Sequence, residues 1–185
     1  MPVLASIFED SEDEAYALLG VDLVGDATTP ETIELLKDNT RKFSKSVTIT
    51  TNEIIRKQLI EGTKKNETIS EISNRIEDTF TGIKKTKADL IARTESARIA
   101  GAGTEQAFID SGVVEGKQWV AEPTACEFCS ALDGVTASLG ENFYNKGDTI
   151  TGVDGGTYTF DYDELPYQPV HPNCRCSIVP ILIKT

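Results

Sequence analysis

Five side chains that bind soft metal ions lie in the last third of the sequence. Cys126 and Cys129 are separated by two residues, and His171 and Cys174 repeat this spacing further along the chain, with Cys176 close behind. Thiolate and imidazole are the ligands that zinc prefers, and a closed structural site takes four of them. The sequence therefore predicts a structural Zn²⁺ ion bound by four of these five residues, with either His171 or Cys176 outside the shell.

Other uses of these side chains stay open at this point. Four cysteines could form two disulfides, as in small secreted proteins, although pairs this close in sequence would close strained rings. A redox pair at Cys126 and Cys129 would belong at a helix N-terminus in an α/β unit. A catalytic zinc would keep one position open for water, whereas five donors favour a closed shell. Glu127 lies between two ligands, and we interpret it as a solvated loop acid.

The elements that must position these ligands are short and rich in turn residues. Strands are predicted at residues 117–121, 157–162 and 177–183, and Pro180 restricts the last of them to a sheet edge or a bulge. A segment of this kind buries too little apolar surface to fold well alone, and Trp119 is its best candidate for a core side chain. A structural zinc ion can contribute on the order of 10 kcal/mol in small modules.

The sequence before residue 112 is patterned for helices. Thr68–Glu71 matches a capping box and is followed by apolar residues at helical spacing, which predicts a helix of about three turns. A longer helix is predicted from about residue 86 to 110, ending at Gly112. Within it, Gly101 and Gly103 would let another part of the chain approach closely.

The chain divides into three predicted parts. Residues 1–28 form an acidic, partly ordered leader with at most one short helix, at Asp13–Leu19. Residues 29–112 form a helical region, with further helices expected after Thr29 and over Asn52–Glu61. Residues 113–185 form the zinc-binding, β-rich region. The predicted fold class is α+β, with a helical N-terminal half followed by a small zinc-stapled β-rich region.

Charge and hydropathy exclude several classes of protein. The net charge is −12, and residues 1–38 carry ten acidic side chains against one lysine. Residues 113–185 carry ten acids and four bases, so direct nucleic-acid binding is disfavoured. No apolar run is long enough to span a membrane, and the N-terminus lacks the pattern of a secretory signal. We expect the chain to be made in the host cytoplasm.

Four motifs in a fixed order resemble one protein family. They are Ala92-Arg93-Thr94-Glu95 in a long helix, Lys117-Gln118-Trp119 after a glycine turn, Cys126-x-x-Cys129 followed by Leu132-Asp133-Gly134, and the closing His171-Pro-Asn-Cys-Arg-Cys176. Together they resemble the phage Mu F-like minor head proteins, also called phage head morphogenesis proteins. The resemblance covers roughly residues 50–183.

The resemblance implies a structural minor head protein of a tailed phage or prophage. Such a protein acts in head assembly at or near the portal, contacts the portal or capsid protein, and ends in the virion head. The resemblance implies no catalytic activity and is compatible with a homo-oligomer. The alternative is a metal-dependent enzyme, a hydrolase or toxin-like transferase, that uses the same site.

The resemblance also assigns a helix motif and a strand aromatic. Arg93, Thr94 and Glu95 match the family's helix motif, and Trp119 matches its strand aromatic. Arg93 and Glu95 have two interpretations: an ordinary pair on the helix surface, or a buried Arg93 that pairs with a carboxylate and locks the helix against the zinc-binding end.

Overall fold

The fold was described from a computed structural model of the chain. The structure describes residues 3–23, 25, 55, 57–59, 61–62, 65, 67–79, 85–160 and 164–184. The helix predicted after Thr29 lies outside these residues. The described part of the Asn52–Glu61 prediction is helical, with Ile55 and Leu59 buried.

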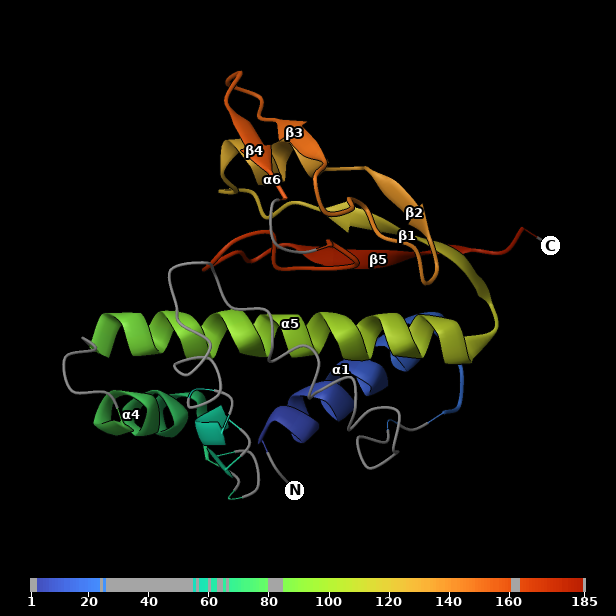
Figure 1. Cartoon of the computed structure of the whole chain (residues 1–185). Coiled ribbons are helices and arrows are strands. Elements are labelled where there is room, and N and C mark those ends of the chain that lie inside the picture. The colour runs from blue at the N-terminus through green and yellow to red at the C-terminus, as the bar shows by residue number, and fades with distance from the viewer. Residues whose placement is uncertain are drawn as a thin grey trace.

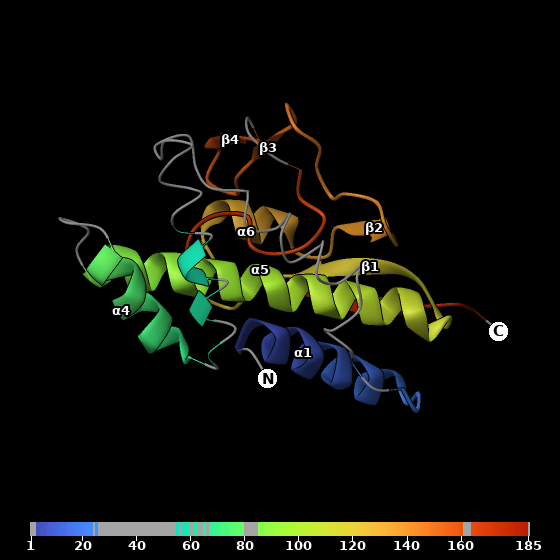
Figure 2. The same cartoon turned by 60° about the horizontal axis from the view of Figure 1, so that its bottom comes forward.

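One long helix divides the molecule into two layers. Helix α5 spans Lys85–Ser111 and runs through the middle of the fold. Helices α1 and α4 lie on one side of α5, and all the strands together with α6 lie on the other (Figure 1). A view turned by 60° shows the same order of layers (Figure 2). The fold class is α+β, as predicted.

The helical layer is built from α5, α1 (Val3–Leu19) and α4 (Ile69–Thr79). The capping box at the start of α4 is confirmed: the Thr68 backbone N–H donates to Glu71 Oε2 at 2.6 Å, and the Glu71 N–H donates to Thr68 Oγ1 at 3.3 Å. Each bond satisfies a backbone donor that the first helical turn leaves without a partner. Helix α4 is then joined to α5 by a 2.6 Å hydrogen bond from Ser73 Oγ to Asp89 Oδ1.

Helix α1 is much longer than the short helix predicted at Asp13–Leu19, and that prediction is wrong. It packs along α5 and buries the side chains of Phe8, Ala15 and Tyr16. The close approach depends on Gly103, because a Cβ atom there would lie 2.6 Å from the Phe8 carbonyl oxygen. The sequence prediction that this glycine admits another backbone is confirmed.

Among the described residues, five short strands and one short helix form the other layer. Strand order in the three-stranded antiparallel sheet is β2-β1-β5, and β3 and β4 form a separate hairpin. Strand β5 is an edge strand, as the presence of Pro180 predicted. Their bounds are Val114–Val120 for β1, Glu127–Leu132 for α6, Thr136–Ser138 for β2, Thr149–Thr151 for β3, Thr157–Thr159 for β4 and Ser177–Leu182 for β5.

The two layers meet through a buried ion pair as well as through apolar contacts. Lys117 of β1 is fully buried, and its Nζ donates to Glu105 Oε1 of α5. The ammonium group also lies 5.4 Å from the centroid of the Phe143 ring, a cation–π distance. Trp119, two residues further along β1, is fully buried and meets Phe143 edge to face. Strand β1 therefore joins the helical layer through Lys117 and packs within its own layer through Trp119.

Candidate metal centre

The pairing of β1 with β5 brings the two ligand-bearing stretches together. Val120, the last residue of β1, lies opposite Ser177, the first residue of β5. The chain leaves β1 and enters α6, where Cys126 is the N-cap residue and Cys129 lies in the first turn. The second stretch, residues 171–176, leads directly into β5. One strand pair therefore fixes the distance between segments that are more than 40 residues apart.

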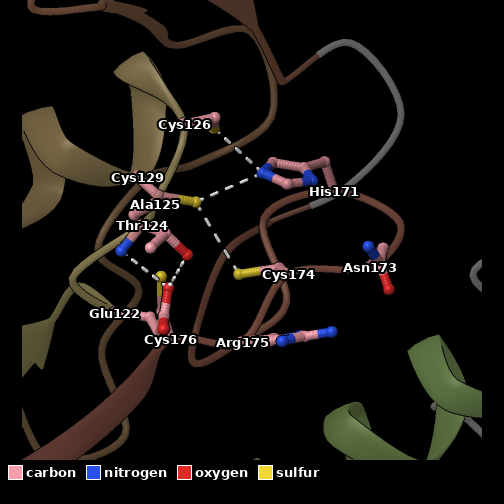
Figure 3. Close-up of a pocket in the computed structure, with 10 residues that line it drawn as sticks. All are labelled: Glu122, Thr124, Ala125, Cys126, Cys129, His171, Asn173, Cys174, Arg175 and Cys176. Carbon is pink, nitrogen blue, oxygen red and sulfur yellow. Dashed lines mark hydrogen bonds between the residues drawn. The ribbon is translucent and has the colours of Figure 1, made fainter.

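The five predicted donors form two overlapping groups. In the first group the donor atoms of Cys126, Cys129 and His171 lie within 4.8 Å of one another, and in the second those of Cys129, Cys174 and Cys176 do the same. Figure 3 shows the Cys129 and Cys174 sulfurs and the His171 ring pointing towards one another. Cys129 belongs to both groups and is buried, whereas Cys126 is exposed.

The shortest contacts match those expected around one tetrahedral ion. His171 Nε2 lies 3.1 Å from Cys126 Sγ and 3.3 Å from Cys129 Sγ, and Cys129 Sγ lies 3.7 Å from Cys174 Sγ. Zinc with its usual bond lengths holds two sulfurs about 3.8 Å apart, and a sulfur and a nitrogen about 3.5 Å apart. A disulfide would need sulfurs about 2.05 Å apart, and all four cysteines are free.

The histidine ring is oriented for metal binding. Its Nδ1 atom lies 2.9 Å from the Pro172 carbonyl oxygen. A carbonyl oxygen can only accept a hydrogen bond, so Nδ1 carries the proton and Nε2 keeps a free lone pair. This is the arrangement of metal-binding histidines, whose second nitrogen donates to a carbonyl or carboxylate group. The donor set therefore fits a thiophilic ion such as zinc.

The three buried thiols shift one another's pKa values. Hydrogen bonds with Cys129 and Cys174 lower the pKa of the Cys176 thiol. Hydrogen bonds with Cys174 and Cys176 raise the pKa of the Cys129 thiol. Burial opposes the charged form at both positions. A bound cation would favour the thiolate form of all three side chains.

One expectation about the first stretch is wrong, and one element of it was not expected. The ligands Cys126 and Cys129 occupy the start of helix α6, where a spacing of three places both on one face. Glu127 is not a solvated acid. A Cβ atom added to Gly152 would lie 2.5 Å from Glu127 Oε2, and one added to Gly156 would lie 2.8 Å away. The carboxylate therefore packs against the turn of the β3–β4 hairpin, where only glycine leaves room.

The helix motif contacts the metal centre through Thr94, and not through Arg93. Arg93 is exposed and forms no ion pair with the described residues, so the idea of a buried Arg93 is wrong. Glu95 is buried, which raises its pKa to about 7, and its Oε2 lies 3.8 Å from Arg98 Nε. The surface-pair interpretation therefore fails as well. Thr94 is buried, and its Oγ1 accepts a 3.3 Å hydrogen bond from the Asn173 backbone N–H.

A solvent-open cavity of about 370 Å³ surrounds the donors. The Glu122 carboxylate lies at its edge and accepts hydrogen bonds from the Thr124 N–H at 2.8 Å and the Thr124 hydroxyl at 2.6 Å. The side chains of Asn173 and Arg175 point away from the sulfurs (Figure 3). The donors are therefore reachable from solvent on the side of Cys126 and His171.

The order of the motifs and this centre agree with a match to a known family. The profile of the Phage Mu protein F like protein family matches residues 53–179, and the chain belongs to this family. The match covers α4, α5, the centre and the first half of β5. It is a family of phage head morphogenesis proteins, which have a structural role. No curated protein and no solved structure shows significant similarity to the chain.

Proposed function

We propose that this chain is a structural minor head protein that acts in head assembly at or near the portal of a tailed phage or prophage. In this proposal one Zn²⁺ ion, bound by Cys126, Cys129, His171 and Cys174, stabilises the β-rich layer. Cys176 stays outside the shell as a hydrogen-bonded neighbour. The family membership supports the role in the head, and the donor geometry supports the metal.

The observation that carries the metal proposal is the unbroken series of short contacts from Cys126 to Cys174. It passes through His171 and Cys129, and each step is 3.1–3.7 Å long. Cys176 belongs to the second group, in which its sulfur and those of Cys129 and Cys174 lie within 4.8 Å of one another. A shell of three sulfurs and one nitrogen is one of the usual closed zinc sites.

Closed coordination supports a structural role over a catalytic one. A catalytic zinc keeps three protein ligands and leaves one position for water. Here five donors form two overlapping groups of three that share Cys129, which is more than a site with three protein ligands needs. Glu127 packs against glycines of the hairpin turn instead of the donors, and the Glu122 carboxylate at the cavity edge accepts hydrogen bonds from Thr124.

The proposed partners are the portal and capsid proteins of the same phage, with the virion head as the final location and the host cytoplasm as the place of assembly. A homo-oligomer is compatible with this role. No described helix has the length and apolarity needed to cross a membrane. The acidic charge of residues 113–185 supports a protein partner over nucleic acid.

Two measurements on one preparation test this proposal. Elemental analysis of the chain purified without added metal should give one zinc per chain, and a Cys129→Ser variant should give none. The wild-type chain should co-elute with the portal protein of the same phage in gel filtration. Zinc at one equivalent with hydrolase or transferase activity would favour the enzyme alternative. Absence of zinc would contradict the metal centre, and separate elution would contradict the portal role.

A further inference from the structure

The segment that carries His171 and Cys174 is docked along one face of helix α5. At one end, Tyr167 and Gln168 lie against Gly101, where a Cβ atom would come within 2.8 Å of Tyr167 Cδ2 and 3.0 Å of Gln168 Cδ. At the other end, the Asn173 N–H donates to Thr94 Oγ1. The segment therefore runs antiparallel to α5 between two points of contact.

These two points lie on the same side of the helix. Thr94 and Gly101 are seven residues apart, which is close to two helical turns and about 10.5 Å along the axis. Glu105, on the same face and one turn further, holds Lys117 of β1. One face of α5 therefore contacts both the strand that precedes the first ligand pair and the segment that carries the second.

The turn between His171 and Cys174 contains one backbone N–H, that of Asn173, that needs a hydrogen-bond acceptor outside the turn. The Cys174 N–H donates to the His171 carbonyl at 3.1 Å, and Asn173 has a φ of 65°. Proline followed by a residue with positive φ is the arrangement of a type II turn, which asparagine tolerates. The turn leaves the Asn173 N–H without a partner inside it, and the Thr94 hydroxyl accepts that hydrogen bond.

The Thr94 hydroxyl is itself held in one orientation. It donates to the Leu90 carbonyl at 2.7 Å, one turn earlier in the helix. With its proton engaged there, a lone pair of Oγ1 remains to accept from Asn173. The side chain therefore transmits the position of the helix backbone to the ligand turn, one residue from Cys174 and two from His171.

We propose that Thr94 and Gly101 are positioning residues for the metal centre, so that metal binding is coupled to residues 94–101 of α5. This inference rests on the proposed metal site and adds to it a requirement outside the ligand set. The helix sets the distance between the His171–Cys174 turn and the start of α6. A bound ion in turn restrains α5 through the same contacts, because the coupling between two sites is reciprocal.

The chain offers a matched control on the same helix. Thr104 Oγ1 donates to the Ala100 carbonyl at 3.0 Å, which repeats the intrahelical bond of Thr94. Thr104 is partly buried and makes no hydrogen bond to the ligand turn among the described residues. A threonine-to-valine change at either position removes the same hydroxyl from the same helix. Only the change at Thr94 removes the acceptor of the Asn173 N–H.

The test measures metal affinity of the full chain by chelator competition, with cobalt as a spectroscopic probe of thiolate coordination. Thr94→Val should weaken binding by about tenfold, as expected when a partly buried donor loses its acceptor. Thr94→Ser should bind almost like the wild type, because serine keeps the hydroxyl. Thr104→Val should also match the wild type. Equal affinity of all four proteins would overturn the positioning role while leaving the metal centre intact.

A second measurement needs no variant. Hydrogen exchange of the wild-type chain should show slower exchange in α5 around residues 94–101 when cobalt or zinc is bound. Unchanged exchange there, with metal bound to the thiolates, would overturn the coupling. A wild-type chain that gives no cobalt–thiolate absorption would overturn the metal centre itself and this inference with it.

Discussion

The two layers of this protein are stabilised in different ways. The helical layer buries apolar side chains from long helices, among them Phe8, Ile76 and Ile99, which are fully buried. The β layer consists of strands of three to seven residues, and two of them form an isolated hairpin. Such a hairpin is marginal in water without further support. The layer with the shorter elements therefore needs links between distant points of the chain.

Those links are polar and specific. Cys129 connects α6 to the segment before β5, and Lys117 connects β1 to α5. Glu127 fits against the turn of the hairpin. Each link depends on a few atoms, whereas the helical layer spreads its stabilisation over many apolar contacts. Changes in the two layers should therefore have separable effects.

Loss of the shared ligand Cys129 should have the largest effect, and it should fall on the β layer. Cys129→Ser removes the donor common to both groups, and we expect loss of the metal and unfolding of residues 120–185, at a cost of several kcal/mol. Limited proteolysis should then cleave the β layer while α1 and α5 stay protected. Cys176→Ser is the matched control and should keep the metal. Full protease resistance of the Cys129→Ser variant would contradict the dependence of this layer on the metal.

The converse change weakens the helical layer alone. Phe8→Ala creates a cavity where α1 crosses α5 at Gly103, and we expect a loss of about 4 kcal/mol in unfolding free energy. Helical circular dichroism at increasing denaturant measures the effect. Cobalt–thiolate absorption should survive in the folded variant at low denaturant, because Phe8 lies on the side of α5 that faces away from the strands. Loss of metal binding together with the native α1 contact would show that the layers are not separable.

The ion pair between Lys117 and Glu105 joins the two layers, so its removal measures how far their stabilities depend on each other. Lys117→Met leaves the Glu105 carboxylate buried without its partner, and we expect a loss of about 3 kcal/mol. The double variant Lys117→Met, Glu105→Leu should recover most of this loss, because it leaves no unpaired charge. Chemical denaturation of the wild type and the two variants measures this recovery. A double variant as unstable as the single one would contradict a role limited to charge pairing.

A smaller effect should come from pH, through Glu95 of α5. Burial raises the pKa of this carboxyl group to about 7, so the folded state binds its proton more tightly than the unfolded chain does. Its contribution to stability is therefore greatest below pH 4.5 and falls as the pH rises to about 7. The total change is about 3 kcal/mol at most.

Glu95→Gln should remove this dependence. The variant should be more stable than the wild type at pH 8, and the two should converge near pH 5. Denaturation of both proteins across this range, with zinc present throughout, cancels the titration of the shared ligands. A constant difference between the two proteins would contradict a raised pKa at Glu95.

Much of the fold could be predicted from local sequence patterns. The capping box at Thr68, the end of α5 at Gly112 and the burial of Trp119 each depend on residues adjacent in sequence, and each is found in the structure. The ligand set was also predictable, because two identical spacings of zinc ligands stand out in a chain with one histidine. The structure brings all five donors together, and the choice of four stays a prediction.

What could not be predicted depends on contacts between distant residues. Helix α1 buries most of the Glu9 and Glu12 side chains. Because these acidic residues lie on its buried face, the sequence does not show a continuous apolar stripe there. The spacing of Phe8, Ala15 and Leu19 was the signal that could have revealed it. Helix α6 is too short to show a period. The contact of Thr94 with Asn173 joins residues 79 positions apart, and no local pattern marks it.

Zinc-edge X-ray absorption of the purified chain identifies the atoms bound to the ion, and so tests whether cysteine thiolates hold it. We expect one zinc per chain with three sulfurs at about 2.3 Å and one nitrogen at about 2.0 Å. Four sulfurs would place Cys176 in the shell in place of His171. A shell made mainly of oxygen, or a folded chain without zinc, would contradict a thiolate-bound ion at the junction of the two strands.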